Sequence, residues 1–160
     1  MKRILPFLMA VIMCATVMAT NPVKVYRGTS TYYSDVVCNV KDGKVYKGNS
    51  AYNSDVLCHI EKNKVYKLNS SYNSDVLYTI RDGKVYDKNS LYESDVVMTI
   101  RDGKVYRGVS KYRSDVIATI VDGYVYYGNS TYSTDRMYTI DGNLTIEEFV
   151  AVWYVFHYVY

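Results

Sequence analysis

Apolar and polar residues recur along most of this chain with a period of 20 residues. From Lys24 onward, six copies follow one another without insertion: KVYRGTSTYYSDVVCNVKDG, KVYKGNSAYNSDVLCHIEKN, KVYKLNSSYNSDVLYTIRDG, KVYDKNSLYESDVVMTIRDG, KVYRGVSKYRSDVIATIVDG and YVYYGNSTYSTDRMYTIDGN. The second, third, seventh, ninth and twelfth positions are Val, Tyr, Ser, Tyr and Asp in every copy. A short fixed period indicates that each copy forms one supersecondary unit and that neighbouring units share a core.

Each copy contains two short segments with the composition of β-strands. One is a Val-Tyr pair, such as Val45-Tyr46, and the other is a run rich in β-branched residues, such as Val76–Ile80. A longer polar loop, such as residues 48–54, joins the two within a copy. Two-residue turns join successive copies at Asp42-Gly43, Lys62-Asn63, Asp82-Gly83, Asp102-Gly103 and Asp122-Gly123. Asp-Gly favours a type I′ hairpin turn, because both central residues of that turn have positive φ.

Pairing across the first turn places Val40 opposite Val45 and Asn39 opposite Tyr46. Because side chains alternate along a strand, one face of the hairpin is apolar, and this holds in five of the six copies. In the sixth copy Arg136 takes a valine position of this face. In the first hairpin the face consists of Val36, Cys38, Val40 and Val45. Six such hairpins give 12 antiparallel strands with a one-sided core, and we expect them to close into a barrel because open edges promote aggregation.

The C-terminal segment differs from the repeats. Thr145 and Glu148 match a helix capping box, and no formal charge follows from Phe149 to Tyr160. A helix that is apolar all round is buried or lies in a membrane, and 12 residues are too few to span a bilayer. We therefore predict a mainly β fold with a hydrophobic helix in the centre of the barrel. A terminal strand is the alternative, because valine and aromatic residues favour strands.

The order of Val-Tyr pair, polar loop, apolar strand and Asp-Gly turn resembles the β-flower family of bacterial proteins. The resemblance covers Lys24 to about Asn143. It implies a closed barrel of repeated hairpins, similar in shape to the tubby C-terminal domain, with residues 145–160 in the place of that domain's plugging helix. Tubby-like domains bind membrane phosphoinositides through basic surface residues, and no matching motif is found in this sequence.

The first 19 residues are typical of a secretory signal peptide, with Lys2 and Arg3 at the start and cleavage near Ala19. We expect export to the periplasm or the medium, followed by a six-repeat domain at residues 20–143 and a helix of the same domain at 144–160. Met13 argues against lipoprotein anchoring at Cys14, because a lipoprotein signal needs a small residue there. Without the signal, 17 basic and 16 acidic side chains remain, and a net charge of +1 gives no reason to expect a nucleic-acid partner.

Few residues suit catalysis. His59 follows Cys58, but strand neighbours point to opposite faces, and His157 lies in the predicted helix. Neither histidine shows the nucleophile and orienting partner of a catalytic site. We expect each repeated serine–aspartate pair to cap its polar loop by hydrogen bonds to nearby backbone amides, with a cation-binding ring of the carboxylates as the alternative. The aspartates are Asp35, Asp55, Asp75, Asp95, Asp115 and Asp135. We therefore predict no enzymatic activity, no cofactor and no metal.

Cys38 and Cys58 occupy the same position in adjacent copies. In a chain of hairpins their strands are two apart, roughly 9.6 Å, which exceeds the Cα separation of about 7 Å that a disulfide allows. The barrel therefore predicts two free, buried thiols, whereas a solenoid with one copy per coil would bring them within bonding distance.

Tyrosine is abundant, with 20 residues against three Phe and one Trp. One repeated set, expected on the outer face of the strands, is a candidate binding surface: Tyr26, Tyr46, Tyr66, Tyr86, Tyr106 and Tyr126. Sideways packing between hairpins is the structural alternative for these rings. A candidate basic rim at the turns consists of Lys41, Lys44, Arg81, Lys84, Arg101 and Lys104. These features predict a non-catalytic binding or structural module for a protein or cell-envelope component, with binding of a glycan or lipid through the loops or the rim as the alternative.

Overall fold

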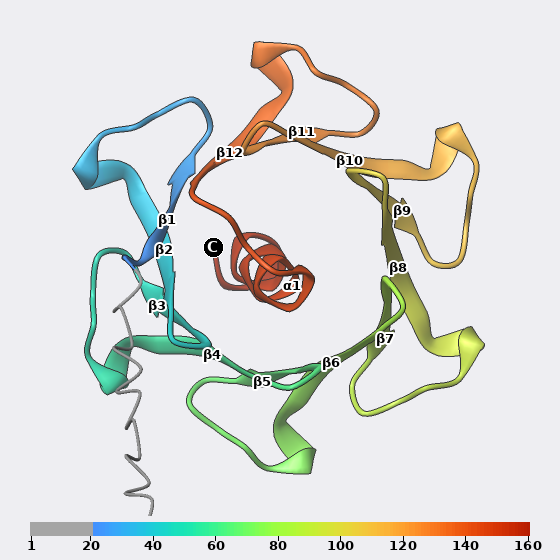
Figure 1. The fold of residues 1–160 in the computed structure, drawn as a ribbon, viewed down its shortest axis with the longest axis horizontal. Coiled ribbons are helices and arrows are strands. Elements are labelled where there is room, and N and C mark those ends of the chain that lie inside the picture. Colours follow the sequence, from blue (N-terminus) through green and yellow to red (C-terminus); the bar gives the residue numbers. More distant parts are fainter. Residues whose placement is uncertain (1–20) are drawn as a thin grey trace, which may run out of the picture.

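The computed structural model describes residues 21–160, and the predicted signal peptide and Cys14 lie outside them. The described residues form a closed antiparallel barrel whose strands follow chain order around the wall, with one helix inside (Figure 1). The strands are β1 (Val23–Arg27), β2 (Val36–Lys41), β3 (Lys44–Lys47), β4 (Val56–Glu61), β5 (Lys64–Lys67), β6 (Val76–Arg81), β7 (Lys84–Asp87), β8 (Val96–Arg101), β9 (Lys104–Arg107), β10 (Val116–Val121), β11 (Tyr124–Tyr127) and β12 (Arg136–Asp141). The predicted 12-stranded barrel with a central C-terminal helix is confirmed, and the alternative of a terminal strand is wrong.

Tight turns join successive copies at one end of the barrel. Lys41 pairs with Lys44 and Val40 with Val45, as the turn chemistry predicts. At the four Asp-Gly turns the aspartate φ is 50–52° and the glycine φ is 69–77°, the positive values that a type I′ turn requires. We call this end of the barrel the turn end.

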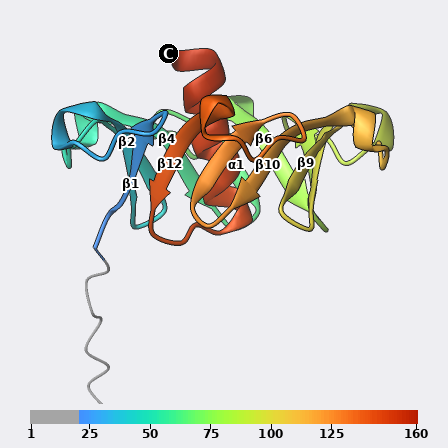
Figure 2. The same ribbon diagram turned by 90° about the horizontal axis from the view of Figure 1, so that it is seen from above.

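The polar loop within each copy projects from the opposite end of the wall. We call these loops petals, and they comprise residues 28–35, 48–55, 68–75, 88–95, 108–115 and 128–135. Each petal ends in a short 3₁₀ turn, such as Tyr33–Asp35 or Asn53–Asp55. The petals radiate outward around the barrel, and Figure 2 shows them at the end where the C-terminus emerges. We call this end the petal end.

A β-bulge in each copy changes the predicted faces. Val25 pairs with Cys38, but Tyr26 pairs with Val36, so Val37 is an extra residue in the ladder. The inward positions of Cys38 and Val40 are confirmed, whereas Val36 lies with the outer tyrosine and is absent from the inner core cluster. The prediction that Val36 faces the interior is wrong because strict alternation fails across a bulge.

The barrel closes between the first and last strands without a covalent turn. Lys24 pairs with Asp141 and Val25 with Ile140, in the same register as a covalently linked hairpin such as β2–β3. Thr139 also donates a hydrogen bond to the Gly28 carbonyl across this seam, at 2.8 Å. The closure removes both open edges of the sheet.

The helix α1 (Ile146–Tyr154) starts at the turn end and continues as a π-helical segment, Val155–Val159, toward the petal end (Figure 2). The predicted capping box is present, because the Thr145 hydroxyl accepts from the Glu148 amide and the Glu148 carboxylate accepts from the Thr145 amide. A ring of fully buried valines surrounds the helix: Val25, Val45, Val65, Val85, Val105 and Val125. A second ring of inward-facing positions has a different side chain in most copies, because an asymmetric helix has to pack inside a symmetric wall. Its members are Cys38, Cys58, Tyr78, Met98, Ala118 and Tyr138.

Candidate functional site

Each petal is held by the same set of hydrogen bonds, which we call the petal clasp. In the second petal, the Ser50 hydroxyl donates to the Asp55 carboxylate at 2.6 Å and accepts from the Tyr52 amide at 3.2 Å. The Asp55 amide then donates to the Tyr52 carbonyl at 2.9 Å. The equivalent bonds occur in all six copies. The clasp fixes the backbone of the tyrosine between its serine and aspartate.

The clasped tyrosines are the most exposed aromatic residues in the repeats. Their rings are 74–78% exposed, and the set comprises Tyr32, Tyr52, Tyr72, Tyr92, Tyr112 and Tyr132. We call them the petal-tip tyrosines. An exposed aromatic ring on a fixed backbone presents contact area at low entropic cost, which is the arrangement favoured at binding surfaces.

The other tyrosine set offers little surface. The residues proposed from the sequence as a candidate binding surface, Tyr26, Tyr46, Tyr66, Tyr86, Tyr106 and Tyr126, are only 5–9% exposed. They lie on the outer side of the wall, where Tyr46 lines a groove together with Tyr33 and Asn49 of neighbouring petals. Because the petals cover these rings, the tyrosines accessible to a partner are the petal-tip set. Both tyrosine sets recur in the repeat pattern, and only the conformation of the loops determines which set is exposed.

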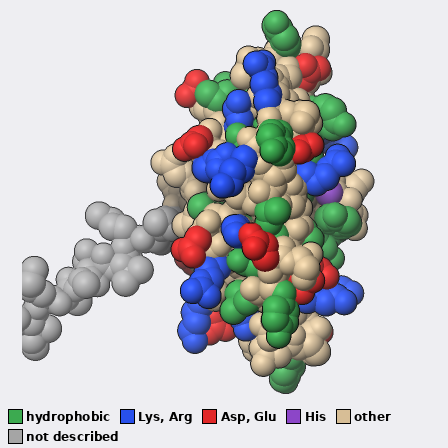
Figure 3. Space-filling model, turned by 90° about the vertical axis from the view of Figure 1, so that its right-hand side faces the viewer, with side chains coloured by type: hydrophobic (Ala, Val, Ile, Leu, Met, Phe, Trp, Pro, Cys, Tyr) green, Lys and Arg blue, Asp and Glu red, His purple; other side chains and the backbone are tan. Residues whose placement is uncertain are grey.

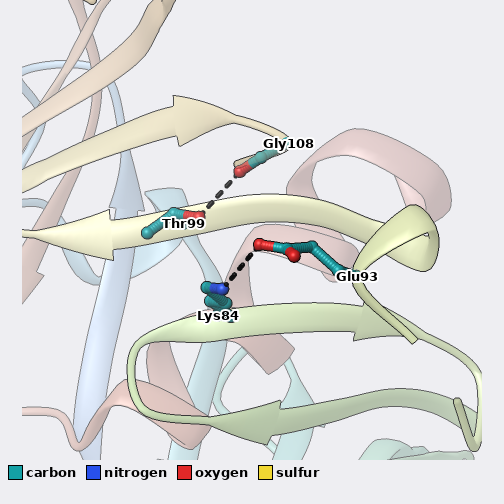
Figure 4. A network of polar contacts seen from close by, with 4 residues as sticks. All are labelled: Lys84, Glu93, Thr99 and Gly108. Atoms are coloured by element: carbon teal, nitrogen blue, oxygen red, sulfur yellow. Dashed lines mark hydrogen bonds and ion pairs between the residues drawn. The ribbon is translucent and has the colours of Figure 1, made fainter. Parts of the chain in front are cut away.

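Polar side chains on the outer wall hold each petal against the copy that precedes it. Thr99 donates to the Gly108 carbonyl at 2.7 Å, as Figure 4 shows, and threonines of other copies repeat this bond. Asn39 and His59 occupy the same position and also bond petal carbonyls. This contact explains why the position is polar although the residues around it are buried.

Four residues of the candidate basic rim contact neighbouring acidic or polar side chains. Lys84 forms an ion pair with Glu93 of its petal at 3.1 Å (Figure 4), and this bond raises the lysine pKa. The Lys104 ammonium group donates to Asn129 at 2.8 Å, so its side chain too reaches a petal. Arg81 and Arg101 are each within 3.7 Å of the aspartate that follows them in the chain. Basic and acidic side chains accordingly intermingle on the face of the molecule seen in Figure 3.

The sixth copy departs from the repeat on the outer wall. Arg136 does not enter the barrel as the sequence pattern suggested, because the bulge turns this position outward. Its guanidinium lies 3.6 Å from the centre of the Tyr124 ring and 5.6 Å from that of Tyr126. Tyr124 replaces the lysine of the other five copies, so two of the exceptional residues of this copy are in contact. Their joint departure from the repeat is the sequence signal that could have identified the pair.

The histidines make structural contacts. The Nδ1 atom of His59 lies 2.9 Å from the Ser70 carbonyl, and that of His157 lies 2.8 Å from the Trp153 carbonyl, so each nitrogen donates to backbone. The His157 ring also stacks on Trp153, with 4.0 Å between centroids. Neither ring is hydrogen-bonded to a serine, threonine or cysteine among residues 21–160.

The two cysteines are free and buried, as the barrel predicts. Desolvation raises the pKa of Cys58 to about 12, and it raises that of Cys38 further, with a contribution from the neighbouring thiol. Both thiols are therefore protonated and shielded near neutral pH.

The repeated aspartates are distributed one to a petal. Each carboxylate accepts from its own serine hydroxyl, and that hydroxyl accepts from a backbone amide of the petal, so the serine–aspartate pair caps the loop and the serine makes the bond to backbone. Within the described part of the chain, no group of three or more histidine, cysteine, aspartate or glutamate residues is arranged to hold a metal ion.

Three depressions surround the last helical turns at the petal end. The largest, about 530 Å³, is lined by Arg27, Asp35, Lys47 and Tyr160. The second, about 510 Å³, lies between Tyr78 and Tyr158, and the third, about 410 Å³, is lined by Arg107, Tyr127, Trp153 and His157. Tyr158 and Tyr160 are 68% and 52% exposed, so aromatic rings also occur at the centre of this end.

In the described residues, no helix has the length and apolar character needed to cross a membrane. A family model described as 6-fold beta flower protein matches residues 25–153. No curated protein and no solved structure matches the chain.

Proposed function

Because this chain belongs to the 6-fold beta flower family, we propose that its six-fold surface is the functional one and that it acts as an exported, non-catalytic binding module. The module binds a protein or another component of the cell envelope through the petal-tip tyrosines. One observation carries this proposal: six tyrosines at equivalent positions are 74–78% exposed, although each has a backbone fixed by the same clasp.

The clasp supports a role in recognition. A serine and an aspartate in every petal restrict a loop that contributes no buried residue from its 3₁₀ turn. Exposed tyrosines on a mobile loop would lose side-chain and backbone entropy on binding, whereas clasped ones lose mainly side-chain entropy. The arrangement therefore lowers the entropic cost of six simultaneous contacts.

Six equivalent contacts favour a repetitive partner. Single tyrosine contacts are weak, but linked contacts strengthen one another when the partner presents several sites at a matching spacing. A cell-envelope surface composed of repeated subunits meets this condition. Polysaccharide is the second candidate, because tyrosine rings stack on sugars and the petal-end depressions place further tyrosines and arginines beside the helix.

Replacement of the petal-tip tyrosines tests the proposal. We expect serine at all six positions to abolish sedimentation of the protein with envelope particles from the producing cell, and serine at three to weaken it strongly. Tyr33→Ser is a matched control, because this tyrosine is 66% exposed but lies outside the set and outside the petal-end depressions. The unfolding midpoint should stay unchanged in every variant, since the rings are exposed.

Binding by the six-fold variant at the wild-type level would disprove the role of the petal tips. A parallel assay on insoluble polysaccharides and on vesicles of phosphatidylglycerol and phosphatidylcholine separates the candidates. Tyrosine-dependent binding to purified polysaccharide would favour the second candidate over the first.

A further inference from the structure

An apolar pocket opens at the turn end, between the barrel wall and the start of α1. Its volume is about 230 Å³, and its lining includes Ile100, Ile120, Ile140, Leu144, Ile146 and Phe149. It lies on the side of the barrel away from β3, β4 and β5, against which α1 packs. Ile100 and Ile120 are half-buried, as is the equivalent Ile60 of β4, whereas Val40 and Ile80 are 3% and 4% exposed. The pocket thus follows from the off-centre helix.

The lining determines what the pocket can hold. Apart from Phe149 its side chains are aliphatic, and its polar atoms come from Thr145, Asn143 and the backbone of the turns. Such a surface gains free energy by covering an apolar group and offers few partners to a polar one. A water molecule occupies about 30 Å³ in the liquid, and if a methylene group is given the same volume, the pocket takes an alkyl chain of roughly seven or eight carbons.

Charges next to the pocket are mainly negative. Asp122 and Asp141 precede the glycines that line it, and Glu147 follows Ile146. None of these three acids forms an ion pair among residues 21–160.

Two cationic groups next to the pocket are already engaged. Arg101 is paired with Asp102 at 3.6 Å, and Lys24, the strand partner of Asp141, lies over the Tyr33 ring. The positive end of the α1 dipole is faced by Glu148.

We propose that this pocket binds a linear alkylamine, with its chain among the isoleucines and its ammonium group facing the acidic mouth. This site is separate from the petal-tip surface, because it lies beside the start of α1. Figure 2 shows that the helix starts at the end of the barrel opposite the petals. Its ligand class differs from the basic-rim hypothesis, which would attract an anionic lipid.

Titration with three eight-carbon ligands tests the proposal. Octylamine, octanol and octanoate share the chain and differ in charge at pH 7. Binding is followed by calorimetry and by fluorescence of Trp153, the one tryptophan of the chain, whose ring centroid is 6.1 Å from that of Phe149. We expect octylamine to bind about tenfold more tightly than octanol and octanoate to bind most weakly. Equal or tighter binding of octanoate would overturn the proposal, as would no binding of octylamine.

Variants locate the site. Ile120→Phe fills the pocket and should reduce octylamine affinity at least about tenfold, whereas Val121→Phe, on the outward-facing neighbour, should not. Asp122→Asn should weaken octylamine about two- to threefold without affecting octanol, and Asp42→Asn is its matched control in the first hairpin. If Ile120→Phe fails to fold, Asp122→Asn on its exposed turn still decides the question. Octylamine binding that is insensitive to both Ile120→Phe and Asp122→Asn would place the ligand elsewhere and overturn the proposal.

Discussion

Two petals begin with a residue in an unfavourable backbone conformation, and replacing it should stabilise the protein. Leu68 and Lys88 have φ of 55° and 52°, at the position where the other four copies have glycine with φ of 52–58°. The left-handed region costs a residue with a Cβ atom about 1–2 kcal/mol. We therefore predict that Leu68→Gly and Lys88→Gly increase the free energy of unfolding.

The magnitude follows from two opposing terms. Relief of the left-handed strain gains about 1–2 kcal/mol, and the greater freedom of glycine in the unfolded chain offsets about 0.5–1 kcal/mol. Little apolar burial is lost, because Leu68 is 55% exposed, and the Thr79 hydroxyl still has the Lys88 backbone carbonyl as its acceptor. At the middle of both ranges the net gain is about 0.75 kcal/mol for each site, so the double variant should melt about 3–8 °C higher.

Thermal and guanidinium unfolding, followed by circular dichroism, measures the effect. Leu68→Ala is the first control, because it removes the side chain but keeps the Cβ atom, and it should change stability by less than about 0.5 kcal/mol. Gly108→Ala is the reverse control: its new Cβ would lie 3.5 Å from the nearest atom, so only the backbone strain, about 1 kcal/mol, is added. Gly83→Ala should cost more, since its Cβ would lie 2.6 Å from the Ile100 carbonyl oxygen. A decrease in stability for Leu68→Gly, or an equal increase for Leu68→Ala, would refute the reasoning.

Three further predictions concern the core and the sixth copy. A chain that ends after Asn143 lacks the helix that covers the inner valine ring, so it should aggregate or lose its cooperative transition in calorimetry; a soluble, cooperatively folded product would contradict this. Burial raises the pKa of both cysteines, that of Cys58 to about 12. Neither thiol should therefore react with Ellman's reagent at pH 8 in the native state, and both should react in guanidinium. Rapid reaction of either thiol in the folded protein would contradict this. Tyr124→Lys should destabilise the protein by about 1 kcal/mol by replacing the aromatic ring under Arg136 with a second cation, whereas adding Arg136→Val should restore most of that loss; chemical denaturation in a double-mutant cycle measures the coupling, and additive effects would refute it.

Much of the wall could be predicted from the sequence because its determinants are local. The Asp-Gly turns determine which residues face one another, and the valine of each Val-Tyr pair faces the helix as alternation requires. The bulge at Val37 could not be predicted from composition, because an extra residue in a ladder leaves no mark in a run of valines. That single feature reversed the side on which Val36 and Arg136 lie.

The candidate surface was harder to predict than the fold. Both tyrosine sets recur every 20 residues, and exposure depends on how the petals fold back over the wall. Tyr46 is covered and Tyr52 is exposed because the Ser50–Asp55 clasp turns the loop between them. The position of α1 within the barrel, and with it the pocket beside Ile120, depends on long-range packing that no local pattern encodes.

The two proposed sites differ in symmetry, and this difference determines which ligands each can distinguish. A feature that occurs six times in equivalent surroundings, as Tyr52 and its counterparts do, presents the same chemistry in six directions. Such a surface can recognise a repeated partner, but it has no means of selecting one orientation over another. The helix breaks this equivalence inside the barrel, because it packs against β3–β5 and leaves the side near Ile120 open. Discrimination of a single small ligand is therefore expected only where the helix meets the wall. Variants at the petal tips and in the turn-end pocket should accordingly affect different ligands without affecting one another.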